Sequence, residues 1–266
     1  MKMNLIIASK TDTGAVREKN EDSVLAEILS GKSNPDCFMI VADGVGGNSA
    51  GEIASKLAVK QFGKYVSLID NNQTDYEKFL KDTIRKINSE IIEKSTDDPE
   101  KWGMSTTFAC GIIAKGKLYV AWAGDSRACV VRNGEILRIT DDHSYVNELL
   151  KSGTISEEQA RAHSRRNVIT RSLGKNPDLD VDTNSQDLLD GDRVLFCTDG
   201  LTEYLTDHEI AYEICRLKTP DKACELLVDR ANERGGKDNI SIIVAHYGAR
   251  KSLIPAKPES LKESEI

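Results

Sequence analysis

The chain has 266 residues, with 36 lysines and arginines against 43 aspartates and glutamates, so its formal net charge at pH 7 is −7. This length suffices for one large domain or two small ones, each with a buried core. The hydrophobic content of 39%, together with 19 glycines, is typical of a globular protein. An acidic chain without a run of basic residues would repel a phosphate backbone, which argues against a nucleic-acid-binding protein.

The apolar segments of the chain are short. The run from Leu5 to Ala8 is shorter than a signal-peptide core of roughly 7–15 residues, and no stretch reaches the roughly 18 apolar residues of a membrane span. The six cysteines lie far apart and form no Cys-x-x-Cys pair, which favours buried thiols over zinc or redox chemistry. We therefore expect a cytoplasmic protein without a membrane partner, and a monomer by default.

In the first part of the chain, short strands are followed by two helices. The first helix is expected to begin at Ser49, with Glu52 completing a capping box, and the second at Thr74, with Glu77 in the same role. The strands are recognised by short runs of β-branched and apolar residues. They are expected at residues 4–10, 23–29 and 38–42.

The middle of the chain changes to a meander of short strands. The pairs Lys115-Gly116 and Asn133-Gly134 mark tight turns, and Asn-Gly is a strong hairpin signal because both residues must adopt positive φ. The segment 143–175 that follows is polar and is expected to form an insert with helices at 145–151 and 156–162. The strands of the meander are expected at residues 108–114, 118–123, 128–132 and 135–139.

The last part of the chain contains two helices between two strands. One helix is expected to be capped at Thr206 with Glu209, and the next to open at Pro220, because proline suits the first helical turn. The strands are expected at 194–198 and 240–246, and residues 250–266 read as a solvated tail. Strands and helices come in runs rather than in regular βαβ alternation, which favours an α+β fold built on antiparallel sheets.

Several predicted strands border an aspartate. Asp43, Asp125 and Asp199 follow strands, and Asp238 stands two residues before the last strand. Because the end of one antiparallel strand lies beside the start of its neighbour, we expect these carboxylates to meet at one edge of the sheet. Any one of them alone is ordinary turn chemistry. Four carboxylates together repel unless cations separate them, and without histidine or cysteine ligands they favour Mg²⁺ or Mn²⁺ in a two-metal hydrolase.

An arginine precedes the second predicted strand. Arg17 stands five residues before Asp22 in a loop, and an arginine fork matches two oxygens of a phosphate dianion. Taken alone, Arg17 is more typical of an ordinary surface ion-pair residue.

Short motifs recur in order along nearly all of residues 5–248. They occupy residues 11–22, 41–47, 103–107, 124–127, 167–174, 198–201 and 237–240. Together they resemble the metal-dependent protein serine/threonine phosphatases of the PPM, or type 2C, family in its compact bacterial form. The resemblance implies two packed antiparallel β-sheets flanked by antiparallel helix pairs, in α/β/β/α layers. It also implies a catalytic domain over residues 1–249, with a flap at about 143–175, and a flexible tail at 250–266.

The resemblance also implies a set of metal ligands for two Mn²⁺ or Mg²⁺ ions and a third, weaker one. Asp43 would bridge two ions, with the Gly44 carbonyl on one of them. Asp199 and Asp238 would bind the other, and Asp125 would share the third ion with Asp199.

Further catalytic roles follow from the same resemblance. Arg17 would bind the substrate phosphate, Asp22 would orient metal-bound water, and Glu21 would contribute through water. Some relatives carry a histidine where this chain has Val45, so the general acid stays open between metal-bound water and the flap histidines. Those histidines are His143 and His163.

The activity implied is hydrolysis of phosphoserine and phosphothreonine by direct attack of a hydroxide that bridges the metals. Its partners would be phosphorylated proteins and a cognate Ser/Thr kinase, and arginines of the flap would receive an acidic or phosphorylated partner. Two alternatives share the fold: a catalytically weak phosphoprotein-binding module, and a phosphoesterase of small metabolites. The complete set of aspartates argues against the binding module.

Two other phosphate motifs are incomplete. The glycines of 46–51 have Walker-like spacing, but Glu52 replaces the lysine and would repel phosphate. Cys224 and Arg230 have the spacing of thiol-dependent phosphatases, but the residues between them contain no glycine and read as helix.

Overall fold

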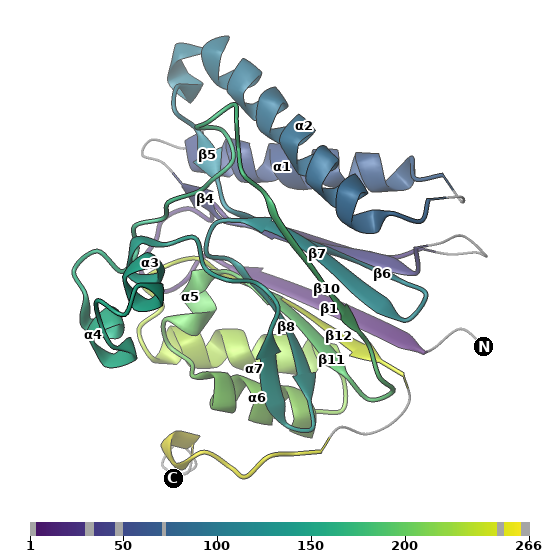
Figure 1. Cartoon of the computed structure of the whole chain (residues 1–266). Helices are drawn as coiled ribbons and strands as arrows, with labels where there is room; N and C mark the ends of the chain where they lie inside the picture. Colours follow the sequence, from purple (N-terminus) through teal and green to yellow (C-terminus); the bar gives the residue numbers. More distant parts are fainter. Residues whose placement is uncertain (1–3, 30–34, 46–49, 71–72, 249–252, 262–266) are drawn as a thin grey trace.

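The computed structural model describes residues 4–29, 35–45, 50–70, 73–248 and 253–261. Two five-stranded sheets lie face to face, and a pair of helices covers the outer face of each sheet (Figure 1). Every pair of neighbouring strands is antiparallel. The expected α+β architecture in α/β/β/α layers is therefore confirmed.

The upper sheet in Figure 1 has the order β10-β7-β6-β3-β2. Its outer face is covered by α1 (Ala50–Ser67) and α2 (Tyr76–Thr96). The strands are β2 (Ser23–Ile28), β3 (Cys37–Ala42), β6 (Phe108–Ala114), β7 (Lys117–Ala123) and β10 (Asp182–Asp187). Beyond β3, the short strands β4 (Gly44–Val45) and β5 (Ser105–Thr106) pair as a separate two-stranded antiparallel sheet.

The lower sheet has the order β1-β12-β11-β8-β9. Its outer face is covered by α6 (Asp207–Arg216) and α7 (Pro220–Glu233). The strands are β1 (Leu5–Asp12), β8 (Arg127–Arg132), β9 (Glu135–Arg138), β11 (Arg193–Cys197) and β12 (Ile240–Tyr247).

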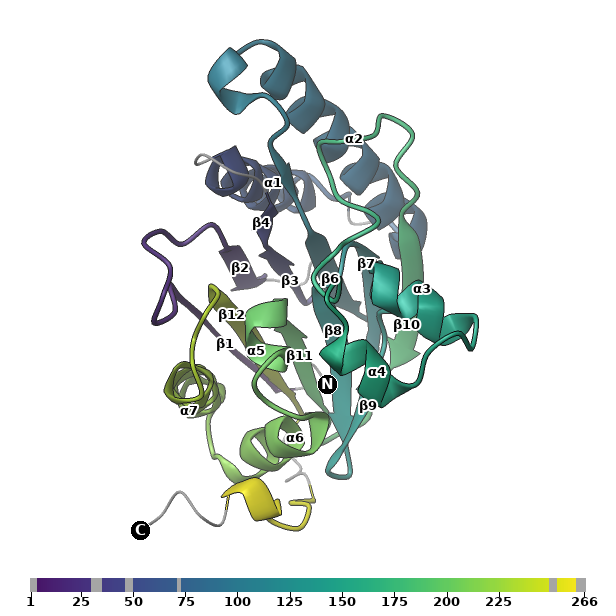
Figure 2. The ribbon, with the colours of Figure 1, turned by 90° about the vertical axis from the view of Figure 1, so that its left-hand side faces the viewer.

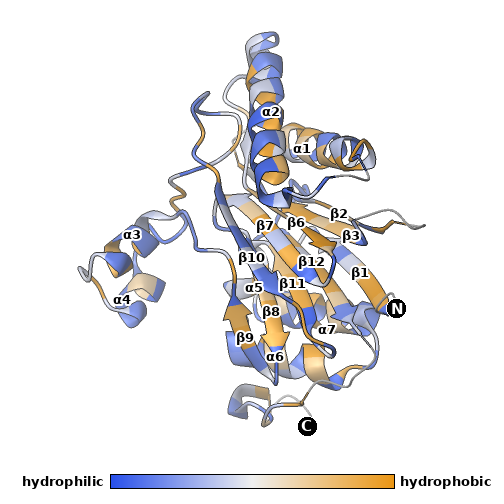
Figure 3. Ribbon diagram, turned by 45° about the vertical axis from the view of Figure 1, so that its right-hand side comes forward, coloured by the Kyte–Doolittle hydropathy of each residue, from blue (hydrophilic) through white to orange (hydrophobic). Residues whose placement is uncertain are grey.

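The core has three apolar layers because alternate residues of a strand face opposite sides of its sheet. In β3, Phe38 and Ile40 pack under α1 and α2, whereas Met39 and Val41 pack against the lower sheet. Figure 3 shows the result: hydrophobic strands lie inside, and the outer faces of the helices are hydrophilic.

The meander predicted from the sequence is divided between the two sheets. The turn residues Lys115 and Asn133 have positive φ (53° and 54°), so both hairpin predictions are confirmed. The chain changes sheets between β7 and β8, where Gly124 has φ 123° and a Cβ on it would lie 2.6 Å from Cβ of Thr107. The meander therefore does not form one continuous sheet, since β6 and β7 belong to the upper sheet and β8 and β9 to the lower one.

Other differences from the sequence-based elements are local. The N-cap of α2 is Asp75, whose carboxylate accepts from the Lys78 amide, so the cap predicted at Thr74 is wrong by one residue. Ser49 lies outside the described residues. Strand β10 was not predicted, because its Asp-Thr-Asn-Ser-Gln-Asp sequence is polar, and it pairs with β7 at the edge of the sheet. The capping box of Thr206 and Glu209 is confirmed.

The expected insert contains α3 (Tyr145–Lys151) and α4 (Glu157–Ala162), which project beside the sheets (Figure 2). Within the described part of the chain, no helix is both long enough and apolar enough to span a membrane.

Part of the C-terminal segment packs against the domain, which differs from the expectation of a solvated tail. Leu261, in the 3₁₀ turn Glu259–Leu261, is fully buried, and Ser260 donates to Glu209 Oε1 at 2.5 Å. A Cβ on Gly134, in the β8–β9 turn, would lie 2.9 Å from Cδ of Pro255. Residues 253–261 therefore line the outer surface around α6 (Figure 1).

We expect Leu261→Ala to destabilise the protein by about 2 kcal/mol or more, because truncating a buried leucine loses transfer free energy and leaves a cavity. Leu253→Ala is the matched control, since Leu253 is 65% exposed. Thermal unfolding of both variants tests this, and equal melting temperatures would contradict a packed C-terminal segment.

Candidate metal centre

The acidic residues singled out from the sequence lie at one end of the β-sandwich. Asp43 follows β3 and Asp125 follows β7, both in the upper sheet. Asp199 opens α5 (Asp199–Thr202) directly after β11, and Asp238 precedes β12, both in the lower sheet. The carboxylates thus come from facing ends of two sheets rather than from the single edge expected. Figure 2 views this end, with α5 and the flap helices α3 and α4 in front.

The position of Asp43 is fixed through its backbone. Its amide donates to Thr107 Oγ1 at 2.9 Å, and its carbonyl accepts from the Thr107 amide and from Thr106 Oγ1, each at 2.8 Å. Both threonines are buried. Sequence reasoning gave these residues no role, although two adjacent hydroxyl residues before an apolar strand are a signal of such anchoring.

Asp22 connects the two halves of the site. Its Oδ2 accepts from Thr198 Oγ1 at 2.9 Å, and this hydroxyl also accepts from the Ser241 amide at 3.0 Å. The other carboxylate oxygen, Oδ1, is buried and has no hydrogen-bond partner among the described residues. The same holds for Asp199 Oδ1. Buried carboxylate oxygens without donors are the atoms that a bound cation or ordered water would satisfy.

Burial and mutual repulsion shift the titration of the whole cluster. Burial raises the pKa of Asp22 to about 7 and that of Asp199 to about 6, with smaller contributions from neighbouring carboxylates. The pKa values of Asp43 and Asp125 lie well above the usual range, again chiefly through burial. Removal from water and like charge both disfavour the ionised form. Bound cations would stabilise the ionised form of such a cluster.

The donor set fits a hard divalent cation, although the side chains are not yet arranged around one. No three described His, Cys, Asp or Glu side chains have their donor atoms gathered as a finished site. Instead Asp238 is paired with Arg17, and Asp22 accepts from Thr198. Oxygen donors from buried carboxylates suit Mg²⁺ or Mn²⁺. Binding would require these side chains to turn away from their present partners.

Arg17 lies at the mouth of this cluster. Its Nη2 donates to Asp238 Oδ2 at 2.8 Å and its Nε donates to the Lys237 carbonyl at 3.3 Å. The side chain is 48% exposed, so the guanidinium remains accessible to a ligand in solvent. Arg17 therefore forms an ion pair, as an ordinary surface arginine would. Its partner, however, is Asp238, a carboxylate of the acidic cluster.

The packing at Gly200 leaves no room for a side chain. A Cβ there would lie 2.0 Å from the backbone oxygen of Asn239. Gly200→Ala must therefore separate α5 from the start of β12, and with them Asp199 from Asp238. We expect this variant to lose most metal affinity and to unfold at lower temperature, whereas Gly153→Ala, with φ 71° and open space around it, should lose only stability. Calorimetric Mn²⁺ titration and thermal unfolding test both variants, and unchanged Mn²⁺ affinity in Gly200→Ala would contradict the site.

His143 is buried and fully hydrogen-bonded. Its Nδ1 accepts from the Gly124 amide at 3.2 Å, which assigns the proton to Nε2, 3.0 Å from Asp182 Oδ2. Its ring stacks on Trp122, and burial lowers its pKa, so the imidazole is neutral. A ring with both nitrogens engaged in the protein cannot readily protonate a leaving group, which removes His143 from the candidates for general acid. His163 is half-buried on the flap.

The flap arginines differ in their availability. Arg166 donates to Glu203 Oε1 at 2.7 Å and Arg171 to Asp182 Oδ1 at 3.1 Å, so both are already paired. Arg165 lies over the ring of Tyr145. Binding of an acidic partner by these arginines stays a prediction. Arg166 and Arg171 would first have to leave Glu203 and Asp182.

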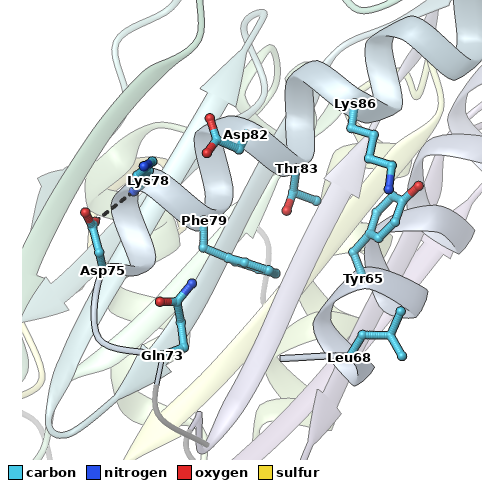
Figure 4. Close-up of a pocket in the computed structure, with 9 residues that line it drawn as sticks. All are labelled: Tyr65, Leu68, Gln73, Asp75, Lys78, Phe79, Asp82, Thr83 and Lys86. Carbon is cyan, nitrogen blue, oxygen red and sulfur yellow. Dashed lines mark hydrogen bonds between the residues drawn. The ribbon is translucent and has the colours of Figure 1, made fainter. Parts of the chain in front are cut away.

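Away from the acidic cluster, a hollow of about 590 Å³ lies between the end of α1 and the start of α2 (Figure 4). The ammonium of Lys86 sits 4.4 Å from the ring centroid of Tyr65 in its wall. The hollow lies at the C-terminal end of α1, which spans 18 residues, or about 27 Å. Its lining, which contains both lysines and aspartates, is separate from the candidate metal centre. It consists of Tyr65, Leu68, Gln73, Asp75, Lys78, Phe79, Asp82, Thr83 and Lys86.

Comparison with known proteins agrees with this geometry. The protein phosphatase 2C family profile matches residues 14–234. A serine/threonine phosphatase of Listeria monocytogenes is 34% identical over 239 residues, covering 88% of this chain and 93% of the relative. Protein phosphatase PhpP of Streptococcus pneumoniae is 36% identical, covering 89% and 95%. The chain belongs to the protein phosphatase 2C family.

Solved structures extend the similarity to three dimensions. The serine/threonine phosphatase of S. agalactiae superposes with a TM-score of 0.84 at 34% identity, over 92% of this chain and all of that one. The catalytic domain of the phosphatase PstP, solved in complex with two manganese ions, gives a TM-score of 0.80 at 30% identity over 92% and 99% of the chains. The predicted family membership is therefore confirmed.

Proposed function

We propose that this protein is a metal-dependent phosphatase that hydrolyses phosphoserine and phosphothreonine in proteins. The observation that carries the proposal is the buried carboxylate cluster, with Asp22 and Asp199 oxygens lacking donors and Arg17 at its mouth. The relatives named serine/threonine phosphatases, and PstP with its two manganese ions, support the same assignment.

In this proposal Asp43, Asp199 and Asp238 would hold two Mn²⁺ or Mg²⁺ ions together with the Gly44 carbonyl, and Asp125 would contribute to a third site. Bound divalent cations supply an activated water and neutralise charge on the phosphate. Asp22 Oδ1, buried and without a donor, accepts a hydrogen bond from the attacking water and orients it. Glu21 contributes from the same loop through water.

Arg17 supplies the remaining positive charge. Its fork binds two phosphate oxygens in place of its present Asp238 contact, and it stabilises charge that shifts in the transition state. Val45 cannot protonate the leaving alkoxide and His143 is enclosed, so water or the flap residue His163 would supply this proton. The partners would be phosphorylated proteins of a Ser/Thr kinase pathway, in the cytoplasm, with the chain acting as a monomer.

The proposal is tested by hydrolysis of a phosphothreonine peptide with metal-stripped protein, before and after addition of Mn²⁺ or Mg²⁺. We expect phosphate release only with metal, and its loss in Asp43→Ala and Asp199→Ala. Folded wild-type protein that binds metal and peptide without releasing phosphate would establish a binding module instead. Faster turnover of small phosphate esters than of any phosphopeptide would favour a metabolite phosphoesterase.

A further inference from the structure

The loop that carries Arg17 has little regular structure of its own. Residues 13–22, between β1 and β2, form turns and bends rather than a paired strand. An arginine that must meet a phosphate at a fixed place needs its backbone held, because misplacement by about 1 Å can reduce catalysis by about 10²-fold. The question is which contacts hold this loop.

Asn239 makes three of those contacts with one side chain. Its Nδ2 donates to the carbonyls of Thr13, at 2.8 Å, and Lys19, at 2.9 Å. Its Oδ1 accepts from the Glu21 amide at 2.8 Å. The two carbonyls flank Arg17 on either side, and the amide belongs to the residue before Asp22. The buried side-chain amide of Asn239 therefore connects the beginning of the loop, at Thr13, with its end, at Lys19 and Glu21.

The anchor of this amide is itself rigid. Asn239 directly precedes β12 and is 5% exposed, and its carbonyl lies against Gly200 at the start of α5. The exposed turn is also held by the Gly236 carbonyl, which accepts from the Ala15 and Val16 amides, and Arg17 Nε donates to the Lys237 carbonyl. Residues 236–239 thus hold the loop that carries Arg17 against the lower sheet.

We propose that Asn239 is a positioning residue for phosphate recognition, which acts by holding the loop that presents Arg17. It touches neither phosphate nor metal in this role. An asparagine amide is suited to it because two donors and one acceptor on a short side chain can satisfy two carbonyls and an amide at once. The kinetic part of the proposal rests on the proposed phosphatase function, whereas the structural part does not.

The test is a double-mutant cycle of Asn239→Ala with Arg17→Ala, measured as kcat/KM on a phosphothreonine peptide at saturating Mn²⁺. We expect Asn239→Ala to lower kcat/KM by about 10- to 100-fold in the wild-type background and by less than about threefold when Arg17 is already absent. The Mn²⁺ concentration for half-maximal activity should stay within about threefold of wild type. Equal losses in both backgrounds, or a loss explained by weaker Mn²⁺ activation, would overturn the proposal.

Asn88→Ala is the matched control. Asn88 is also a buried asparagine that closes a loop, since it donates to the Asn176 carbonyl and accepts from the Gly174 amide, each at 2.7 Å. It should lower the melting temperature to a similar degree without changing KM. Should Asn239→Ala not fold, Asn239→Asp keeps the acceptor for the Glu21 amide and removes both donors.

Hydrogen exchange supplies a readout that needs no activity. In metal-free protein, Asn239→Ala should accelerate amide exchange in the peptide covering residues 13–22 by at least about tenfold, relative to both wild type and Asn88→Ala. Unchanged exchange in this peptide would overturn the positioning role even in an active enzyme. A wild-type protein that releases no phosphate, with faster exchange in the variant, would refute the phosphatase function and leave the anchoring established.

Discussion

Asp43→Asn is expected to lower the metal-dependent kcat by about 10³-fold or more. Asparagine keeps the shape of the side chain, so the backbone contacts with Thr106 and Thr107 should survive. It removes the negative charge with which a carboxylate binds divalent cations, and losing one electrostatic contact at a reaction centre typically reduces kcat by about 10²–10³-fold. Steady-state kinetics and Mn²⁺ titration calorimetry measure the two effects. An active Asp43→Asn enzyme with normal metal affinity would contradict the assignment.

The same substitution should stabilise the metal-free protein at alkaline pH. The pKa of Asp43 is raised in the folded state by burial and by neighbouring carboxylates, so its ionisation opposes folding. The pKa of Asp22 is raised to about 7 and that of Asp199 to about 6, so metal-free stability falls as the pH rises from the ordinary carboxyl pKa of about 4 to about 7. Each kcal/mol of repulsion removed should raise the melting temperature by about 2–4 °C.

The pH dependence distinguishes repulsion from repacking. At pH 8 Asp22 and Asp199, with pKa values of about 7 and about 6, are ionised and repel a carboxylate but not an amide at position 43, so Asp43→Asn should melt above wild type. Near pH 5 both neighbours are protonated, and the difference should shrink. Saturating Mn²⁺ should reverse the order, because only wild type gains the free energy of metal binding. Asp178→Asn, at an exposed position, is the control for charge removal. A difference that does not change with pH would contradict the electrostatic origin.

Arg17→Ala is expected to lower kcat/KM by about 10²–10³-fold, with part of the loss in KM. The arginine contributes binding in the ground state and additional stabilisation as charge shifts on the phosphate. Arg17→Lys should recover only part of the activity, because an ammonium cannot make the two parallel contacts of a guanidinium. Inhibition by inorganic phosphate should weaken in parallel in both variants.

Metal binding separates this role from a structural one. Arg17 is paired with Asp238, so its removal frees a proposed metal ligand and should not weaken Mn²⁺ affinity. Arg138→Ala removes an arginine on β9 that is paired with Asp207 and is the charge-matched control. Loss of Mn²⁺ affinity in Arg17→Ala, or an equal kinetic loss in Arg138→Ala, would contradict phosphate binding by Arg17.

Local chemistry explains what could be predicted from the sequence. The Thr206 capping box and the Asn133-Gly134 turn need only residues a few positions apart, so their patterns indicate the structure directly. The unbroken apolar run of β3, in which all six residues are buried, likewise indicates a strand from its local sequence. The acidic strand ends were recognisable because aspartates follow apolar runs, and the motifs around them resembled one family.

Tertiary structure decided the features that depend on distant segments. Nothing local to β8 determines whether it continues the sheet of β7 or joins β11, yet this choice brings Asp125 toward Asp199. Strand β10 is polar, and it forms at the edge of the sheet because its neighbour β7 hydrogen-bonds to its backbone. The pairing of β1 with β12 joins the two ends of the chain.

The arrangement of the site residues likewise depends on contacts between residues that are far apart in the sequence. The Arg17 contact with Asp238, the Asn239 amide across the loop and the burial of Leu261 each join residues that sequence patterns treat as unrelated. Residue types and local spacing by themselves determined which chemistry this protein carries. Only the packing of two sheets determined which carboxylates face one another, because burial and repulsion arise between segments that meet after folding.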